Sequence, residues 1–333
     1  MNSDSIVLDK TELLAELCGP NDYNLSILGD LLGTRIFSRG NELSIESDDD
    51  ETRRLFSSLV DALVTSIEGG LPATPDLIIA LHAELTPLGE QGERLSRDRR
   101  MADGASEEGS CDGFLESCIQ IPGSRIKVYP RSRGQGLYLK GLAAHDLTFA
   151  VGPAGTGKTY LAMAWALREL LVKAKRKLIL TRPIVEAGES LGFLPGDLVQ
   201  KINPYLRPLY DAMETLLPNE VVRRLEESRS IEVAPLAYMR GRSLSNCVII
   251  LDEAQNTTKE QMKMFLTRLG ENSTAIVTGD ITQIDLPKRI ESGLVHALDI
   301  LESIDDIFIS RLDARDVVRS RLVRKIIEAY ENE

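Results

Sequence analysis

A glycine-rich segment at residues 152–159 constrains the fold of this chain more than any other feature. It reads Gly-Pro-Ala-Gly-Thr-Gly-Lys-Thr and matches the G-x-x-x-x-G-K-T pattern of a phosphate-binding loop. A hydrophobic run at 146–151 precedes it, and apolar residues at helical spacing follow at 158–171. Because a strand, a turn and a helix in this order point backbone N–H groups at a phosphate, the sequence predicts a nucleoside triphosphate site. The predicted binding residues are Gly152, Pro153, Ala154, Gly155, Thr156, Gly157, Lys158 and Thr159.

Two side chains of this loop have distinct expected roles. Lys158 is expected to reach the β- and γ-phosphates, and the Thr159 hydroxyl is expected to bind Mg²⁺. The alternative is a chance match on a glycine-rich turn, and the flanking strand and helix patterns argue against it. We therefore expect a triphosphate to bind together with Mg²⁺.

A second apolar strand, at 246–251, ends in two carboxylates, Asp252 and Glu253. In an open α/β sheet, ligands lie at the carboxyl ends of the strands. We expect Asp252 to lie near Mg²⁺ and Glu253 to polarise the water that attacks the γ-phosphate, which predicts hydrolysis. The alternative is a pair of solvated acids at a strand end.

A third apolar strand, at 274–277, leads into polar residues. Asp280 and Gln283 are candidates to sense the γ-phosphate, and Thr278 is a weaker one. Taken alone, a strand followed by a Gly-Asp turn is also common in ordinary loops.

Strand and helix patterns alternate from residue 119 onwards. Further strands are predicted at 178–180, 231–233 and 307–310, and helices at 196–217, 221–228, 259–269, 293–304 and 317–330. This alternation predicts an α/β fold with a parallel sheet and helices on both faces. We assign residues 119–333 to a P-loop ATPase domain and residues 89–118, which are poor in apolar side chains, to a flexible linker.

Residues 1–88 form a predicted small acidic α+β domain. Strands at 35–37 and 42–45 lie between a short helix at 25–32 and an amphipathic helix that begins near 48–51, and a further short helix follows at 72–87. The arrangement is similar to a KH-type nucleic-acid module. However, Gly29 and Gly33 are one residue too far apart for its G-x-x-G loop, so nucleic-acid binding by this domain stays open.

Composition and charge restrict the class of protein. The net charge of −12 is concentrated in the N-terminal third, so the remainder can hold basic patches for nucleic acid without requiring them. Four scattered cysteines and three histidines show neither a disulfide framework nor metal-ligand spacing. No apolar run is long enough to span a membrane. These observations predict a soluble, reduced, cytoplasmic protein.

Several segments together resemble the PhoH family of bacterial ATPases. Besides the phosphate-binding loop, they are the segments at 181–196, 238–242, 252–256 and 278–283. The resemblance implies a P-loop NTPase fold like that of RecA and of the first motor domain of superfamily-one helicases. The acidic N-terminal domain resembles that of the PhoH-like branch without a PIN domain.

This resemblance also implies a ligand and partners. Helicases of the related group place a glutamine against adenine, and Gln135 occupies the matching position, so ATP is the expected nucleotide. RNA is the expected polymer, contacted by Arg182, Arg240 and Arg242. A YbeY-type endoribonuclease is the implied partner in ribosomal RNA maturation.

Efficient phosphoryl transfer needs an arginine near the γ-phosphate. Because few residues follow Gln283, we expect a neighbouring subunit of a homo-oligomeric ring to supply it. Arg319 is the first candidate, and Arg311 and Arg315 are alternatives. Arg319 matches the family's C-terminal segment, although Ser320 and Arg321 replace its His-Pro. The other interpretation is that these arginines form surface ion pairs with Asp313, Asp316 or Glu328.

Two other functions share the same motifs. The chain could be an ATP-gated protein–protein adaptor whose acidic N-terminal third docks a basic partner. It could also be a small-molecule kinase, although Glu253 and Gln283 suit water activation better than a kinase, which shields its phosphate from water.

Overall fold

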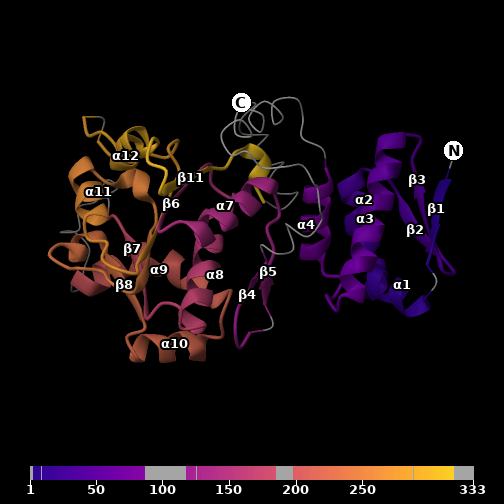
Figure 1. Ribbon diagram of the computed structural model, residues 1–333, viewed down its shortest axis with the longest axis horizontal. Helices are drawn as coiled ribbons and strands as arrows, with labels where there is room; N and C mark the ends of the chain where they lie inside the picture. Colours follow the sequence, from indigo (N-terminus) through magenta and orange to yellow (C-terminus); the bar gives the residue numbers. More distant parts are fainter. Residues whose placement is uncertain are drawn as a thin grey trace. The chain divides into compact units, whose positions relative to one another are not determined.

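The computed structural model describes residues 3–8, 10–86, 118–124, 126–184, 198–287 and 289–318 (Figure 1). The chain divides into two compact units, Met1–Cys118 with Tyr129–Arg133, and Ile119–Val128 with Gly134–Glu333. Each unit has hydrophobic clusters of its own. The predicted linker at 89–118 lies almost entirely outside the described residues.

The first unit contains a three-stranded antiparallel sheet in the order β1-β3-β2. Its elements are β1 (Ser3–Val7), α1 (Thr11–Cys18), η1 (Pro20–Asp22), α2 (Tyr23–Leu32), β2 (Ile36–Arg39), β3 (Glu42–Glu46), α3 (Asp50–Glu68) and α4 (Pro75–Leu85). Asp49 begins α3 by accepting the N–H groups of Glu51 and Thr52, and Thr74 caps α4. The apolar faces of these elements meet in one core that includes Leu28, Leu43, Phe56, Leu63 and Leu77.

Local patterns predicted β2, β3, α2, α3 and α4, but they did not predict β1 and α1. Gly29 lies inside α2, and Gly33 ends that helix with a φ of 66°. These two glycines therefore belong to a helix and its cap rather than to a loop that could clamp a nucleic-acid backbone.

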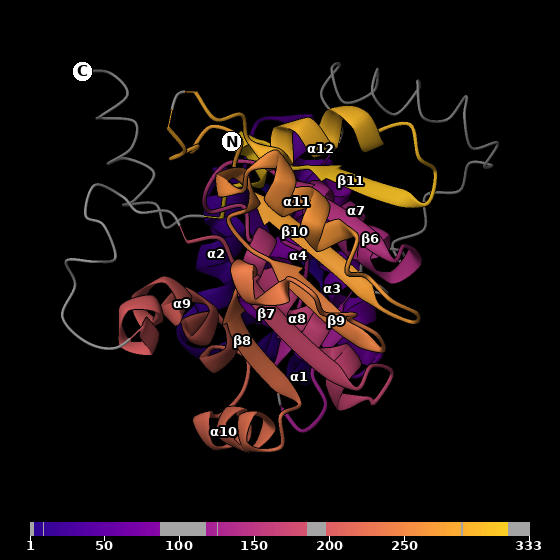
Figure 2. The same ribbon diagram turned by 90° about the vertical axis from the view of Figure 1, so that its left-hand side faces the viewer.

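The second unit is built on a six-stranded parallel sheet in the order β11-β6-β10-β9-β7-β8. Figure 2 shows the strands side by side. They are β6 (Leu147–Val151), β7 (Lys177–Arg182), β8 (Ile231–Pro235), β9 (Cys247–Leu251), β10 (Thr274–Gly279) and β11 (Ile307–Arg311). The helices are α7 (Arg133–Ala144), α8 (Lys158–Leu171), α9 (Leu198–Glu214), α10 (Asn219–Glu227), α11 (Lys259–Leu266) and α12 (Gly293–Leu301). Short elements complete the unit: β4 (Ile119–Gln120), β5 (Lys127–Val128), η2 (Leu236–Met239), η3 (Ala254–Asn256) and η4 (Ala314–Asp316).

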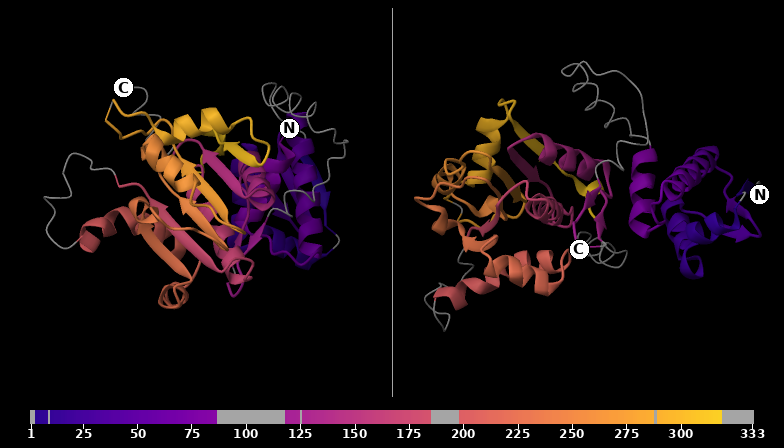
Figure 3. Two further views of the ribbon diagram at one scale, coloured as in Figure 1. Left: turned by 60° about the vertical axis from the view of Figure 1, so that its left-hand side comes forward. Right: turned by 60° about the horizontal axis from the view of Figure 1, so that its bottom comes forward.

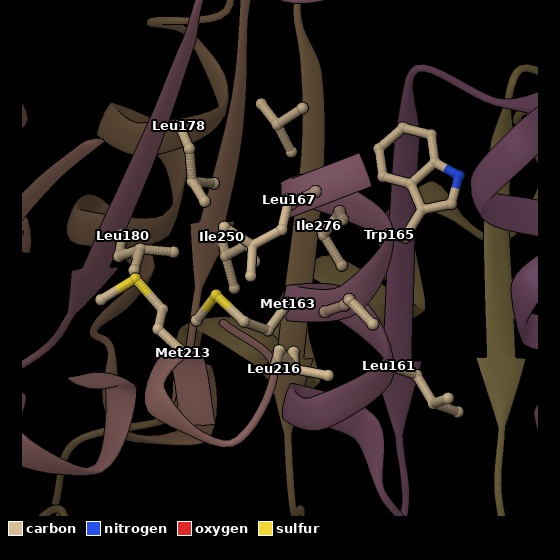
Figure 4. Close-up of a cluster of buried hydrophobic side chains, with 14 of the residues drawn as sticks. Leu161, Met163, Trp165, Leu167, Leu178, Leu180, Met213, Leu216, Ile250 and Ile276 are labelled. Carbon is tan, nitrogen blue, oxygen red and sulfur yellow. The ribbon is translucent and has the colours of Figure 1, made fainter. Parts of the chain in front are cut away.

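Alternate residues of each strand point to opposite faces of this sheet, so each face has side chains to bury. Helices cover both faces. Leu178 and Leu180 join Ile250, Ile276 and side chains of α7, α8 and α9 in one cluster (Figure 4). Ile179, with Ile249 and Val277 of the other strands, packs on the opposite face, against α11 and α12. In Figure 3, α9 and α10 lie beside β8, at the edge of the sheet. The predicted α/β fold, a parallel sheet of P-loop NTPase type with helices on both faces, is confirmed.

Helix α7 was not predicted, because its glycines lower helix propensity. One of them has a packing reason. A Cβ atom at Gly141 would lie 2.0 Å from a ring carbon of Phe308, so α7 packs closely on β11 only without a side chain there.

The last predicted helix, at 317–330, differs at its start. Val317 and Val318 are not helical, and the remaining positions lie outside the described residues. Among the residues that the structure describes, no helix is long and apolar enough to cross a membrane.

Candidate active site

Four neighbouring strands bring the predicted motifs to one edge of the sheet. The phosphate-binding loop follows β6, Asp280 follows β10, Asp252 and Glu253 follow β9, and Arg182 ends β7. Because these strands are parallel and adjacent in the order β6-β10-β9-β7, their carboxyl ends share this edge. A pocket of about 290 Å³ lies there, lined by Ala154, Gly155, Gly157, Lys158, Thr159, Tyr160, Asp252, Glu253, Gly279, Asp280 and Gln283.

The phosphate-binding loop folds around the ammonium group of Lys158. Lys158 Nζ donates to the carbonyl oxygens of Gly152 and Pro153, at 2.6 and 2.8 Å, and to Thr156 Oγ1 at 3.3 Å. Burial lowers the pKa of Lys158, and three carboxylates oppose that shift, those of Asp280, Glu253 and Asp252. The Lys158 ammonium group therefore lies inside the curve of the loop, where a bound phosphate would contact it.

Thr159 and Asp252 lie together, as a shared Mg²⁺ site requires. Thr159 Oγ1 donates to Asp252 Oδ1 at 2.7 Å, and Thr278 Oγ1 donates to the same oxygen at 2.7 Å. Asp252 is only 5% exposed. Hydroxyl and carboxylate oxygens are hard ligands of the kind that Mg²⁺ prefers, so these residues fit the ion. Thr278, the weakest sensor candidate in the sequence, contacts the carboxylate of this site.

Each carboxylate oxygen of Glu253 has a polar partner, an ion pair on one and a hydrogen bond on the other. Arg182 Nη2 lies 3.1 Å from Glu253 Oε1, and Gln255 Nε2 donates to Oε2 at 2.6 Å. The backbone at Glu253 is left-handed, with a φ of 53°, which is uncommon for a residue other than glycine. Glu253 therefore sits in a constrained conformation at the pocket, as functional residues often do.

Gln255 connects Glu253 to the third motif. Its Oε1 accepts the N–H of Asp280 at 3.0 Å, and its Nε2 also donates to the carbonyl oxygen of Gln283 at 3.2 Å. No role was predicted for Gln255. It stands two positions after Glu253, and its side chain turns back toward that acid. Asp280 Oδ1 accepts from Thr282, whereas Asp280 Oδ2 is buried without a hydrogen-bond partner in the described part of the chain.

Gln135, the residue expected to contact adenine, lies beneath the phosphate-binding loop. It is 3% exposed, and its Nε2 donates to the carbonyl oxygen of Thr156 at 3.0 Å. A Cβ atom at Gly157 would lie 3.2 Å from the same nitrogen. In this structure Gln135 supports the loop and is not among the residues that line the pocket. Its contact with adenine stays a prediction.

The three arginines proposed for RNA lie in different surroundings. Arg182 contacts Glu253 and also donates to the carbonyl oxygen of Tyr205 at 3.2 Å. Arg242 forms a two-pronged ion pair with Glu232, at 2.6 and 2.9 Å, and Lys177 Nζ lies 2.5 Å from the same carboxylate. Arg240 is exposed, and within the described residues its side chain makes no hydrogen bond or ion pair. Of the three, Arg240 alone combines exposure with a side chain that has no such partner.

The ion pair of Arg242 predicts a pH-dependent stability. Hydrogen bonds from Arg242 lower the pKa of Glu232 from 4.5 to about 2, and Lys177 adds to the effect. The pair therefore stabilises the fold fully above pH 4.5 and loses this contribution as the pH falls toward 2. Replacing Arg242 with alanine is expected to lower the free energy of unfolding at pH 7 by about 1–2 kcal/mol.

Urea denaturation at several pH values measures this effect. The difference between wild type and Arg242→Ala is expected to shrink as the pH falls below 4.5, where Glu232 begins to be protonated in the unfolded chain. Arg240→Ala, two residues away and exposed, is the matched control and should leave stability nearly unchanged. An Arg242→Ala protein as stable as wild type at every pH would contradict the structural role.

The C-terminal part of the described chain packs on the same loop. The N–H of Leu312 donates to Val151 O at 2.8 Å, and the N–H of Val318 donates to Gly155 O at 2.9 Å. A Cβ atom at Gly152 would lie 2.5 Å from Leu312 O. This segment therefore lies against the start of the phosphate-binding loop.

Two of the three arginine-finger candidates are paired locally. Arg311 contacts Glu302 at 2.9 Å, and Arg315 contacts Asp313 at 2.6 Å, as the surface-pair interpretation expected for Arg315. Arg319 lies outside the described residues, so its role stays a prediction.

Taken together, these residues form the site of a nucleotide-hydrolysing P-loop enzyme. Comparison with known proteins agrees with this conclusion. The family model described as "PhoH-like protein" matches residues 127–331. PhoH-like proteins of Mycobacterium leprae and Bacillus subtilis are each 45% identical, over 96% and 95% of this chain and 86% and 93% of their own lengths. Protein PhoH of Escherichia coli K12 is 47% identical over 61% of this chain and 58% of its own length.

Among solved structures, the Pif1 helicase of Candida albicans aligns with 59% of this chain and 42% of its own, at 15% identity and a TM-score of 0.29. A likeness at that level carries no argument here. The sequence matches are sufficient: the chain belongs to the PhoH-like protein family.

Proposed function

We propose that this chain binds ATP with Mg²⁺, hydrolyses it, and uses the hydrolysis to remodel or escort RNA. The observation that carries the proposal is the shared pocket of Lys158, Thr159, Asp252, Glu253 and Gln283. These residues come from three separate motifs and meet because β6, β10 and β9 are adjacent. A site that binds a phosphate without hydrolysing it would not need the carboxylate of Glu253.

Each side chain has a role that follows from its position. Lys158 would exchange its bonds to the loop carbonyls for phosphate oxygens, and α8 would direct its N-terminus at the same group. Thr159 and Asp252 would hold Mg²⁺, which supplies positive charge to the phosphates when bound. Glu253 would orient and polarise the attacking water, and Gln283 would contact the γ-phosphate from the neighbouring strand.

In this proposal RNA binds to the basic surface residues and not to the acidic N-terminal unit. Arg240 is exposed and has no partner to release within the described residues, which suits a phosphate contact. RNA cleavage would belong to a partner, for which a YbeY-type endoribonuclease is our candidate. An oligomeric ring would provide the arginine that completes the site.

Steady-state ATP hydrolysis with Mg²⁺, measured with and without single-stranded RNA, tests the proposal. We expect hydrolysis by the wild-type chain and an increase of several-fold with RNA. Lys158→Ala should lower the rate by about 100-fold or more, because the cation that binds the β- and γ-phosphates is lost. Its fold should persist, since the parallel sheet and the hydrophobic cluster around α8 hold this unit together without that side chain.

Each outcome selects a function. Hydrolysis that RNA leaves unchanged would favour the ATP-gated adaptor. Transfer of the γ-phosphate to a small molecule, with little release of free phosphate, would favour a kinase. Equal rates for Lys158→Ala and wild type would show that the activity does not arise at this pocket.

A further inference from the structure

The pairing of Glu253 with Arg182 is not what a water-activating carboxylate requires. Glu253 Oε1 lies 3.1 Å from Arg182 Nη2, and Oε2 accepts from Gln255 at 2.6 Å. Each oxygen that could accept a proton from water therefore already has one partner in the protein. A carboxylate oxygen bonded to a guanidinium offers less negative charge to any further donor. In this arrangement Glu253 is restrained from its proposed reaction.

The Arg182 side chain comes from the neighbouring strand and extends beyond the active site. β7 pairs with β9, and the N–H of Asp252 donates to Thr181 O at 2.9 Å, so the ends of the two strands are held together. The Arg182 side chain is 20% exposed and that of Glu253 is 36% exposed, so the ion pair is partly shielded from solvent. Its second nitrogen, Nη1, donates to the carbonyl oxygen of Tyr205 in α9 at 3.2 Å.

One guanidinium therefore links α9 to Glu253. Because α9 packs on β7 and β8 at the edge of the sheet, a ligand bound on that side can move α9 or draw the guanidinium away. An RNA phosphate competes well for this group, since arginine binds phosphate and carboxylate with the same planar geometry. Loss of the ion pair would leave Glu253 Oε1 available to water.

We propose that Arg182 is a positioning residue that holds Glu253 in a restrained state and releases it when an anionic polymer binds on the α9 side. Hydrolysis is then slow in the free protein and rises when the ion pair opens. The inference rests on the proposed function, because it concerns the residue assigned to activate water. It also changes the role of Arg182 from an RNA contact alone to a connection between RNA binding and hydrolysis.

Arg182→Ala in the full chain tests the restraint. We expect the basal kcat for ATP to rise about tenfold, with little change in KM, because the barrier falls while the phosphate-binding loop is unaltered. Addition of single-stranded RNA should then raise the rate no further. Arg207→Ala is the matched control, since Arg207 lies on α9 in exposed ion pairs and should leave the basal rate unchanged.

Two further variants separate restraint from structural damage. The double variant Arg182→Ala with Glu253→Gln should be as slow as Glu253→Gln alone, because the effect of Arg182 acts through Glu253. Arg182→Lys keeps the charge but cannot hold Glu253 and Tyr205 at once, so its basal rate should lie between those of wild type and Arg182→Ala. Arg182→Lys also tests the restraint if Arg182→Ala fails to fold.

The possible results are distinct. A wild-type chain without Mg²⁺-dependent hydrolysis would overturn the proposed function and this inference with it. If wild type hydrolyses ATP but the folded Arg182 variants are slower or unchanged, only the restraint is overturned. Continued stimulation of Arg182→Ala by RNA would also overturn the coupling.

Discussion

Replacing Glu253 with glutamine is expected to lower the rate of ATP hydrolysis by about 10²–10⁴-fold, while the protein still binds ATP. Glutamine keeps the shape of the side chain but cannot accept a proton from the attacking water. Lys158, Thr159 and Asp252 are unaltered, so the phosphate-binding loop and the proposed Mg²⁺ ligands remain in place. The variant should therefore accumulate bound, unhydrolysed ATP.

Two measurements on the same preparation check this expectation. Single-turnover hydrolysis gives the chemical rate, and equilibrium binding of labelled ATP gives the affinity. Asn256→Ala is a useful control, because the Asn256 side chain hydrogen-bonds to Asp285 and does not line the pocket. A Glu253→Gln protein that hydrolyses ATP at the wild-type rate would refute Glu253 as the group that activates water.

Replacing Arg319 with alanine is expected to lower ATP hydrolysis by about 10³–10⁵-fold without loss of ATP binding, if Arg319 is the arginine finger. The reason is that such an arginine neutralises charge that develops mainly in the transition state. Arg311 and Arg315, which are paired with Glu302 and Asp313, should give far smaller losses when replaced. Steady-state rates for the three alanine variants provide the comparison.

Mixing variants decides whether the finger acts within one chain or between two. In a ring, Arg319→Ala subunits supply an intact phosphate-binding loop, and Lys158→Ala subunits supply Arg319. Mixed oligomers should therefore recover part of the wild-type activity at interfaces where an intact phosphate-binding loop meets Arg319 of the other variant. A finger acting within its own chain allows no such recovery, because neither variant then has a complete site.

The structure makes a finger that acts within its own chain a real alternative. Val318, the last described residue, donates its N–H to Gly155 O in the phosphate-binding loop of its own chain. Mixed oligomers that form but show no recovered activity would exclude the arrangement between subunits. A monomeric wild-type protein with full activity would exclude it as well.

The amino-acid sequence by itself determined the local parts of the site. The spacing of the glycines, Lys158 and Thr159 requires a tight loop before a helix, and α8 begins at Lys158. The apolar run before Asp252 is fully buried as β9, so the acidic pair could be placed at a strand end from the sequence alone. These features depend on residues that are neighbours along the chain, which is why local patterns reveal them.

Only the tertiary structure decided which of these parts meet. The position of β10 between β6 and β9 carries Thr278 to Asp252 and Asp280 to Gln255, and no local pattern specifies that order. Gln135 is drawn beneath the loop, and Arg182 pairs with Glu253, because strand pairing and burial bring together residues far apart in the sequence. Such contacts depend on which strands share hydrogen bonds and which polar groups need partners once buried, and those conditions arise only when the whole sheet has formed.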